Sequence, residues 1–147
     1  MYSITTQFTF EAAHRLRTAY TEACFKNLHG HSYKVEVEIA SKVPNQDNMV
    51  CDFKKLKEIL YHNIEEKYDH SCILHIDDPL AEPVRKNCDK VFLWQENPTA
   101  ESMARKFYYD ISTTPAFRDL SCDLVRVTVW ETEHNMATYK PDWQETC

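Results

Sequence analysis

Two segments near the start of the chain alternate between apolar and polar side chains. In residues 2–14 the even positions carry most of the apolar side chains and end in His14, whereas the odd positions are mostly polar. Residues 29–40 alternate in the same way, and His29 and His31 share the parity of the valines. Because successive side chains of a strand point to opposite faces, each segment predicts a strand with one buried face. Antiparallel pairing of the two strands would bring the three histidines together.

Residues 52–67 follow a helical period instead. Their apolar side chains recur at steps of three and four residues, and Asp52 stands at the position of an N-cap. A second helix is expected to begin at residues 97–99, with Pro98 in its first turn, and to end at Pro115. The sequence therefore predicts two helices, each with one apolar face.

The other segments give weaker patterns. Residues 15–28 and 68–89 lack a sustained period and are expected to be irregular, with room for a short helix over 80–86. Short strands are expected at residues 91–94, 124–131 and 136–139. The main elements follow the order ββααββ, which predicts an α+β fold with an antiparallel sheet of about four strands and two helices on one face. Residues 1–147 are expected to form a single domain with a loose tail from about residue 141.

The composition excludes several classes of protein. With 17 basic and 23 acidic residues the net charge is −6, which argues against broad nucleic-acid binding but leaves room for a small anionic substrate. The single glycine, Gly30, rules out the glycine-rich phosphate loops of nucleotide-binding proteins. No apolar run is long enough to cross a membrane, and the first residues do not resemble a secretion signal. Six scattered cysteines then predict reduced thiols and a cytoplasmic location.

His14, His29 and His31 form the first candidate site. Residues i and i+2 of a strand point the same way, so His29 and His31 can converge on one ion, and His14 on the neighbouring strand has the matching phase. Three protein ligands with one open position describe a catalytic zinc site. Gly30 removes a side chain between two of these ligands and frees the backbone. The alternative is three ordinary histidines, one of them in the core of a strand.

Two further sets of residues could transfer protons. Cys24 lies between the two histidine strands, where a nearby cation would favour its thiolate and let it act as a general base. It could equally be a small apolar side chain or a fourth zinc ligand. Asp69 can orient the adjacent His70 and raise its basicity, provided that the backbone bends there. The alternative for this pair is an ordinary surface location, and His75 competes with His70 for the role.

Glu131 continues the row of valines in the strand expected at 124–131. A carboxylate in such a row is costly unless it is paired. It can accept two parallel hydrogen bonds from a flat, guanidine-like edge, which an arginine or a ligand ring could supply, and Arg126 has the opposite parity. Thr99 and Glu101 stand at the start of the second helix, where they are most simply a cap and a match to the helix dipole.

Several short motifs occur in a characteristic order along the chain. They are Phe10-Glu11-Ala12-Ala13-His14, Cys24 with His29-Gly30-His31, Asp52-Phe53, Asp69-His70, Pro98-Thr99-Ala100-Glu101, and Glu131-Thr132 with Asn135 and Tyr139-Lys140. As a set these motifs resemble the 6-pyruvoyltetrahydropterin synthase and 6-carboxytetrahydropterin synthase family, and the resemblance covers nearly the whole chain.

The resemblance implies a fold, an assembly and a set of roles. The fold would be the tunnelling fold (T-fold), and the subunits would form barrel-like homohexamers with active sites at subunit interfaces. The substrate would be 7,8-dihydroneopterin triphosphate, with Zn²⁺ as the cofactor. The implied roles are zinc ligands for His14, His29 and His31, proton-abstracting base for Cys24, acid/base pair for Asp69 and His70, and pterin contacts for Glu131, Thr99 and Glu101.

The motifs do not by themselves choose a branch of this family. Four residues separate Cys24 from His29, whereas the queuosine branch commonly has three and the animal biopterin branch five. Residues 76–96 are also longer than in the shorter queuosine-branch members. Because compact members commonly serve the queuosine pathway, we expect a lyase that forms 6-carboxy-5,6,7,8-tetrahydropterin with loss of triphosphate and acetaldehyde. The alternatives are a 6-pyruvoyltetrahydropterin synthase, a zinc-containing T-fold protein that binds a pterin or purine without turnover, and an interaction protein with a structural zinc site.

Overall fold

A computed structural model describes residues 1–142 of the chain. Its strands are β1 (Tyr2–His14), β2 (His29–Ser41), β3 (Ser71–His75), β4 (Val91–Trp94), β5 (Asp123–Trp130) and β6 (Met136–Tyr139). Its helices are α1 (Glu22–Lys26), α2 (Phe53–Leu60), the π-helical turn η1 (Tyr61–Glu65), α3 (Glu66–Tyr68), α4 (Ala81–Asn87), α5 (Ala100–Ser112) and α6 (Pro115–Arg118). The loose tail expected from about residue 141 falls mainly on residues 143–147, which lie outside the described residues.

The strands form one sheet in the order β4-β3-β1-β2-β5-β6. β1 and β2 pair antiparallel along their full lengths, as do β2 with β5 and β5 with β6, whereas the pairs β1–β3 and β3–β4 are parallel. The predicted α+β class is confirmed. The expected antiparallel sheet of about four strands is wrong, because the sheet formed by residues 1–142 is mixed and has six strands. The predicted order ββααββ lacks two strands, because β3 and β4 lie between the two main helical segments.

β3 lies inside the segment 68–89, which the sequence predicts to be irregular. Four of its five residues are buried, so the strand has no polar side that could produce an alternating pattern. A strand that is parallel to its neighbours and covered on both faces commonly lacks this alternation. The same segment contains α4 at the place of the short helix expected over 80–86, and β4 is the strand predicted at 91–94.

The helix predicted over 52–67 is present as α2, η1 and α3 in succession. The Asp52 carboxylate accepts the Lys54 N–H at 2.7 Å, which confirms the predicted N-cap. The helical segment therefore begins at the residue that the Asp52 cap and the helical period of apolar side chains predict.

The start of α5 differs slightly from the prediction. Thr99 is its N-cap, so Pro98 precedes the helix and does not lie in its first turn. Pro115 stands in the first turn of α6, just after α5 ends. The residues 15–28 expected as a loop contain the short helix α1, which has no buried residue and therefore no apolar periodicity for a pattern to detect.

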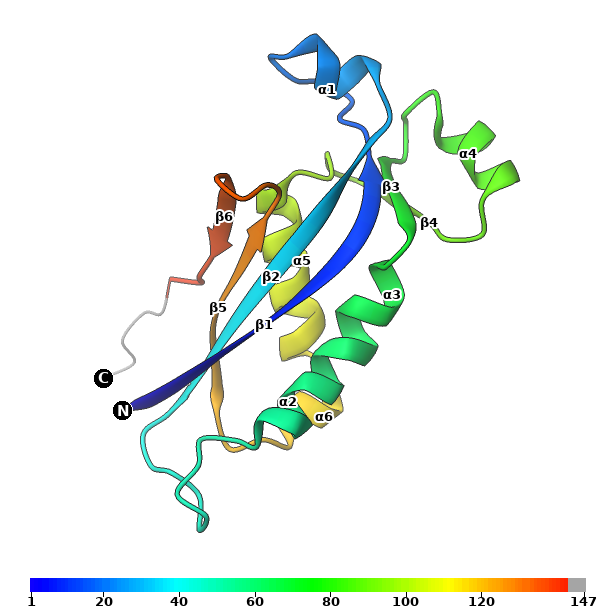
Figure 1. Cartoon of the computed structure of the whole chain (residues 1–147). Coiled ribbons are helices and arrows are strands. Elements are labelled where there is room, and N and C mark those ends of the chain that lie inside the picture. The colour runs from blue at the N-terminus through cyan, green and yellow to red at the C-terminus, as the bar shows by residue number, and fades with distance from the viewer. Residues whose placement is uncertain (143–147) are drawn as a thin grey trace.

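The helices cover one face of the sheet. Figure 1 shows α2, α3 and α5 along that face, α1 beyond the end of the β1–β2 pair, and the N-terminus near the other end. The even positions of β1 and the odd positions of β2 point toward the helices, where the ring of Phe10 packs on those of Tyr33 and Phe107 at centroid distances of 5.1 and 5.9 Å. None of the helices within residues 1–142 combines the length and apolar character that a membrane span needs.

Candidate functional site

The three histidines predicted as metal ligands lie together at one end of the sheet. His14 faces His29 directly across the β1–β2 ladder, and His31 stands opposite Ala12. Each histidine offers one ring nitrogen, and these nitrogens all lie within 4.8 Å of one another. His14 is buried, whereas His29 and His31 are partly exposed. The structure therefore brings the three side chains into one cluster that solvent reaches.

Hydrogen bonds determine which ring nitrogens face the cluster. His14 Nδ1 lies 2.8 Å from the Pro98 carbonyl oxygen, and His29 Nδ1 lies 3.0 Å from the Asn27 carbonyl oxygen. Because a carbonyl oxygen only accepts, each Nδ1 carries the proton and each Nε2 presents a lone pair. The two Nε2 atoms are 3.1 Å apart, close to the roughly 3.3 Å between two nitrogens on one tetrahedral zinc ion. Two lone pairs at this distance repel, and a bound cation removes the repulsion.

Burial disfavours the charged form of two of the three imidazoles, those of His14 and His31. It lowers the pKa of His14 and of His31 below the ordinary value, and the nearby Glu131 carboxylate acts in the opposite direction. His31 Nε2 is buried, has no hydrogen-bond partner within residues 1–142, and lies 3.7 Å from a Glu131 carboxylate oxygen. Neutral imidazoles with available lone pairs are ligands for zinc and similar transition metals. The donor set therefore fits a divalent metal ion.

Gly30 lies between His29 and His31, where the backbone of β1 leaves little room for a side chain. Its φ is not positive, so the expected gain in backbone freedom is not used. A Cβ at this position would lie 3.3 Å from the Ala12 carbonyl oxygen on β1. The glycine thus allows close approach of β1 and β2 beside the histidines.

Cys24 lies on α1, between β1 and β2. Its carbonyl oxygen accepts the Leu16 N–H at 3.1 Å, and its own N–H donates to the Thr21 carbonyl at 3.1 Å. The residue is half-buried and forms no disulfide with another cysteine of residues 1–142. In the part of the chain that the structure describes, the converging metal-binding group contains the three histidines and not this thiol. The arrangement thus favours an open site with three protein ligands over a closed site with four.

Asp69 and His70 form a hydrogen-bonded pair on the turn between α3 and β3. His70 Nδ1 lies 2.7 Å from an Asp69 carboxylate oxygen. The φ of His70 is 59°, which is the bend that adjacent side chains need in order to meet and which costs a non-glycine residue about 1–2 kcal/mol. The Glu11 N–H donates to the other Asp69 oxygen at 2.8 Å, and the His70 N–H donates to the Glu11 carbonyl at 2.7 Å, so β1 holds the turn. The Glu11 hydrogen bond, followed by that of His70, lowers the pKa of the Asp69 carboxyl group.

A pocket of about 390 Å³ opens beside His70. Its lining includes His31 but, among the described residues, not Cys24. His75, the competing candidate, is engaged in its own turn, where its Nδ1 accepts the Asp77 N–H at 3.0 Å. The geometry therefore favours His70 as the partner of the carboxylate, and the thiol is not among the described residues that line the pocket beside this pair.

Glu131 lies one residue beyond β5, at the end of the strand expected over 124–131. Arg126 forms ion pairs with two glutamates of β2. Within residues 1–142, His31 is the only basic side chain within 4 Å of the Glu131 carboxylate, at 3.7 Å. The Glu131 carboxylate therefore forms no ion pair with Arg126 and is available to a ligand.

Thr99 and Glu101 stand where α5 begins. The Thr99 hydroxyl accepts the Ser102 N–H at 3.2 Å, as predicted for a cap. Glu101 is exposed in the first turn of the helix. Thr99 follows Pro98, whose carbonyl oxygen holds the ring of His14, so the start of α5 lies next to the histidine cluster.

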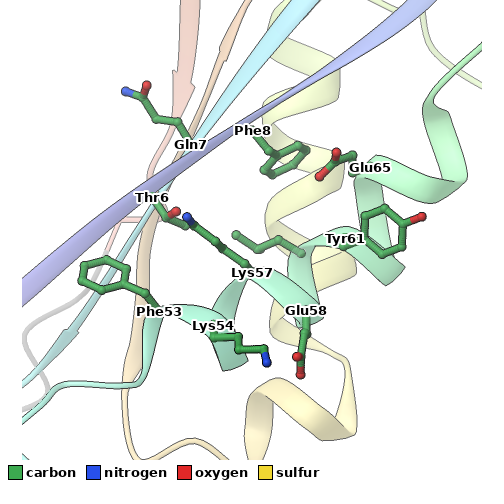
Figure 2. Close-up of a pocket in the computed structure, with 10 residues that line it drawn as sticks. Thr6, Gln7, Phe8, Phe53, Lys54, Lys57, Glu58, Tyr61 and Glu65 are labelled. Atoms are coloured by element: carbon green, nitrogen blue, oxygen red, sulfur yellow. The ribbon is translucent and has the colours of Figure 1, made fainter.

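A second groove lies away from all these side chains. Figure 2 shows it between β1 and α2, with Phe8, Phe53 and Tyr61 around it. Its volume is about 680 Å³, and no predicted site residue lines it. The size of a groove therefore does not locate the candidate site in this fold.

The chain is similar in sequence to proteins of known family. Residues 3–142 match the family model described as 6-pyruvoyl tetrahydropterin synthase. The chain belongs to this family. A 6-carboxy-5,6,7,8-tetrahydropterin synthase of Rickettsia felis is 38% identical over 106 residues, which are 71% of this chain and 75% of the relative. The Aquifex aeolicus protein of the same name is 32% identical, over 96% of this chain and 99% of the relative.

Solved structures share the fold of this 6-pyruvoyl tetrahydropterin synthase family member. An uncharacterised protein from Wolinella succinogenes superposes with a TM-score of 0.80 at 23% identity, over 95% of this chain and 97% of that one. The Caenorhabditis elegans 6-pyruvoyl tetrahydropterin synthase gives a TM-score of 0.71 at 24% identity, over 95% of both chains. The family resemblance inferred from the motifs is confirmed, and with it the predicted enzyme class, a lyase of the tetrahydropterin synthase type.

Sequence reasoning missed the groups that orient the candidate side chains of this family member. Pro98 and Asn27 hold two histidine rings through carbonyl oxygens, and Glu11 holds Asp69 through its N–H. Backbone groups carry no residue-type signal. A pattern of residue types therefore could not have indicated these contacts.

Proposed function

We propose that the chain is a zinc-dependent 6-carboxy-5,6,7,8-tetrahydropterin synthase. It would convert 7,8-dihydroneopterin triphosphate with loss of triphosphate and acetaldehyde, in queuosine biosynthesis. The observation that carries the proposal is the pair of Nε2 lone pairs of His14 and His29, 3.1 Å apart, with the unpartnered His31 Nε2 in the same cluster. The names of the relatives support the choice of a pterin product.

His14, His29 and His31 are the residues that would hold the zinc ion. When bound, zinc polarises the side-chain hydroxyls of the substrate and makes the neighbouring protons easier to remove. The Pro98 and Asn27 carbonyls keep two of the rings oriented with Nε2 toward the metal position.

Two groups of the chain would move protons. Cys24 would accept a proton from the substrate side chain as a thiolate, which a nearby cation favours. Asp69 would hold Nδ1–H of His70, so that the other ring nitrogen exchanges a proton with the substrate. Triphosphate would leave by elimination, and cleavage of the side chain with addition of one water molecule would release acetaldehyde and leave a carboxylate on the ring.

A second copy of the chain would complete the site. The pocket beside His70 does not include Cys24 within residues 1–142, which supports a homohexamer with active sites at subunit interfaces. β1 pairs with β3 only over residues 12–14, and β6 has one neighbour in the described sheet. These edges offer backbone hydrogen bonds to another copy. We further propose one domain over residues 1–147 and a cytoplasmic location.

Glu131 would bind the amino-pyrimidine edge of the pterin, with Thr99 and Glu101 nearby. Glu131→Gln is expected to weaken pterin binding roughly 10- to 100-fold, because a hydrogen bond to a charged acceptor contributes about 1.5–3 kcal/mol. Pterin fluorescence titration measures the Kd. The control is Glu133→Gln, an exposed glutamate two residues further on, which is expected to bind as the unchanged protein does. Equal affinities for both variants would remove Glu131 from the pterin site.

The proposed reaction is tested by incubating zinc-loaded protein with 7,8-dihydroneopterin triphosphate and identifying the products by mass spectrometry. A carboxypterin with acetaldehyde is the expected result. A pyruvoyl pterin without acetaldehyde would favour the alternative, a 6-pyruvoyltetrahydropterin synthase, which the matching family model supports. Unchanged substrate with zinc bound would contradict both and favour a pterin- or purine-binding protein without turnover.

A further inference from the structure

A buried ion pair ties the segment that carries Cys24 to the turn before α4. Arg15 Nη1 lies 2.5 Å from Asp78 Oδ1, and the exposed fractions of the two side chains are 16% and 0%. The Nε–H of the same guanidinium donates to the Phe25 carbonyl oxygen at 2.7 Å. Phe25 follows Cys24 directly, so one planar group links the segment of the thiol to a buried point of the fold.

Both ends of this link are themselves fixed. Asp78 Oδ1 also accepts the Leu80 N–H at 2.8 Å, which holds the carboxylate within its own turn. At the other end, the Leu16 N–H donates to the Cys24 carbonyl at 3.1 Å. The carbonyl groups of Cys24 and Phe25 therefore both accept hydrogen bonds, the first from the Leu16 N–H and the second from the Arg15 guanidinium.

The energetics of such a pair favour a positioning role. Removing two charges from water offsets most of their attraction, so a buried ion pair adds little net stability but can select one arrangement. Asp78 Oδ2 is buried and has no hydrogen-bond partner within residues 1–142, so Arg15 is the charge that compensates this carboxylate. The neighbouring pair of Arg17 and Asp77 differs, because its atoms are 3.5 Å apart and both side chains are more than half exposed.

We propose that Arg15 and Asp78 are positioning residues for the Cys24 thiol. By holding the Phe25 carbonyl, the guanidinium fixes α1 above the end of the sheet where the histidines lie. This inference rests on the proposed role of Cys24 as the base. A displacement of about 1 Å in a reacting group can lower a rate about 100-fold, so the pair sets the rate of turnover without touching the substrate.

The test uses the double variant Arg15→Met/Asp78→Asn in the zinc-loaded full chain. It removes both charges together, keeps the aliphatic stem, and keeps a carbonyl oxygen for the Leu80 N–H. We expect hydrogen exchange of residues 16–26 to become at least about tenfold faster and kcat to fall roughly 10- to 100-fold. KM, the zinc-dependent thermal shift and exchange elsewhere are expected to stay unchanged.

The matched control is Arg17→Met/Asp77→Asn, the exposed pair beside it, which is expected to leave exchange and kcat as they are. The single variant Arg15→Lys keeps the charge, but one ammonium group cannot reproduce the fork that contacts two acceptors. Faster exchange of residues 16–26 and a lower kcat are therefore expected for it as well, at unchanged melting temperature.

Two results would overturn the proposal. One is unchanged exchange over residues 16–26 in the double variant, and the other is a loss of protection throughout the chain, which would make the pair a support of the whole fold. If the unaltered protein turns over no substrate, the proposed function fails. In that case the exchange data and the rate at which iodoacetamide labels Cys24 still support or overturn the positioning role.

Discussion

Replacing Cys24 by alanine is expected to lower kcat about 1,000-fold, within the range that a general base contributes, while zinc and pterin still bind. The thiol lies on α1 and outside the converging group of histidines. Its removal would therefore take away the proposed proton acceptor and leave the histidine nitrogens in place. Turnover of 7,8-dihydroneopterin triphosphate and the zinc content of the purified variant are the two measurements.

Cys88→Ala is the control for this experiment. Cys88 is an exposed cysteine at the end of α4, and its replacement is expected to leave kcat unchanged. A loss of zinc from the Cys24 variant would instead make the thiol a fourth ligand and the site a structural one. An unchanged kcat would remove Cys24 from the mechanism.

Replacing His29 by alanine is expected to abolish both turnover and stabilisation by zinc. An ion present at about 100 times its Kd stabilises the folded state that binds it by about 2.7 kcal/mol. For a chain of this size that corresponds to a rise in Tm of roughly 5–10 °C. His29 supplies one of the two Nε2 atoms that lie 3.1 Å apart, so without it the ion loses a ligand and the shift disappears.

The metal-free proteins give a second measure of the same site. His29→Ala removes the repulsion between two lone pairs, so its Tm without zinc is expected to equal or exceed that of the unaltered apoprotein. His62→Ala is the control, because His62 is exposed and pairs with Glu66 on the helix surface. It is expected to keep the full zinc-dependent shift. The same shift in the His29 variant would show that the ion binds elsewhere.

The histidine cluster could be predicted because it follows from strand geometry alone. The period of two places His14, His29 and His31 on one face, and pairing of β1 with β2 supplies the rest. The period of 3.6 located α2 and α5 in the same way. β3 could not be predicted from a pattern, because burial on both of its faces removes the alternation on which such a prediction depends.

The proposed proton-transfer residues could be predicted from the sequence only in part. Asp69 and His70 are adjacent, so their contact could be anticipated, but the left-handed backbone of His70 that makes it possible is supported by Glu11, 58 positions from Asp69. Arg15 and Asp78 are 63 positions apart. Contacts between segments so far apart depend on the sheet order β3-β1-β2, which local patterns do not encode.

The ladder between β1 and β2 also bears on how this hairpin can change during evolution. His14 and His29 are placed opposite each other by continuous pairing from Tyr2–Ser41 to His14–His29, and not by the length of the connection between them. Extending a connecting loop is inexpensive, since each doubling of its length costs about 0.6 kcal/mol. Insertions and deletions in residues 17–26, which leave the Asn27 carbonyl beside the His29 ring, can therefore move the thiol while the imidazoles stay where they are. The four-residue gap between Cys24 and His29 can therefore change in length without altering the pairing that brings the histidines together.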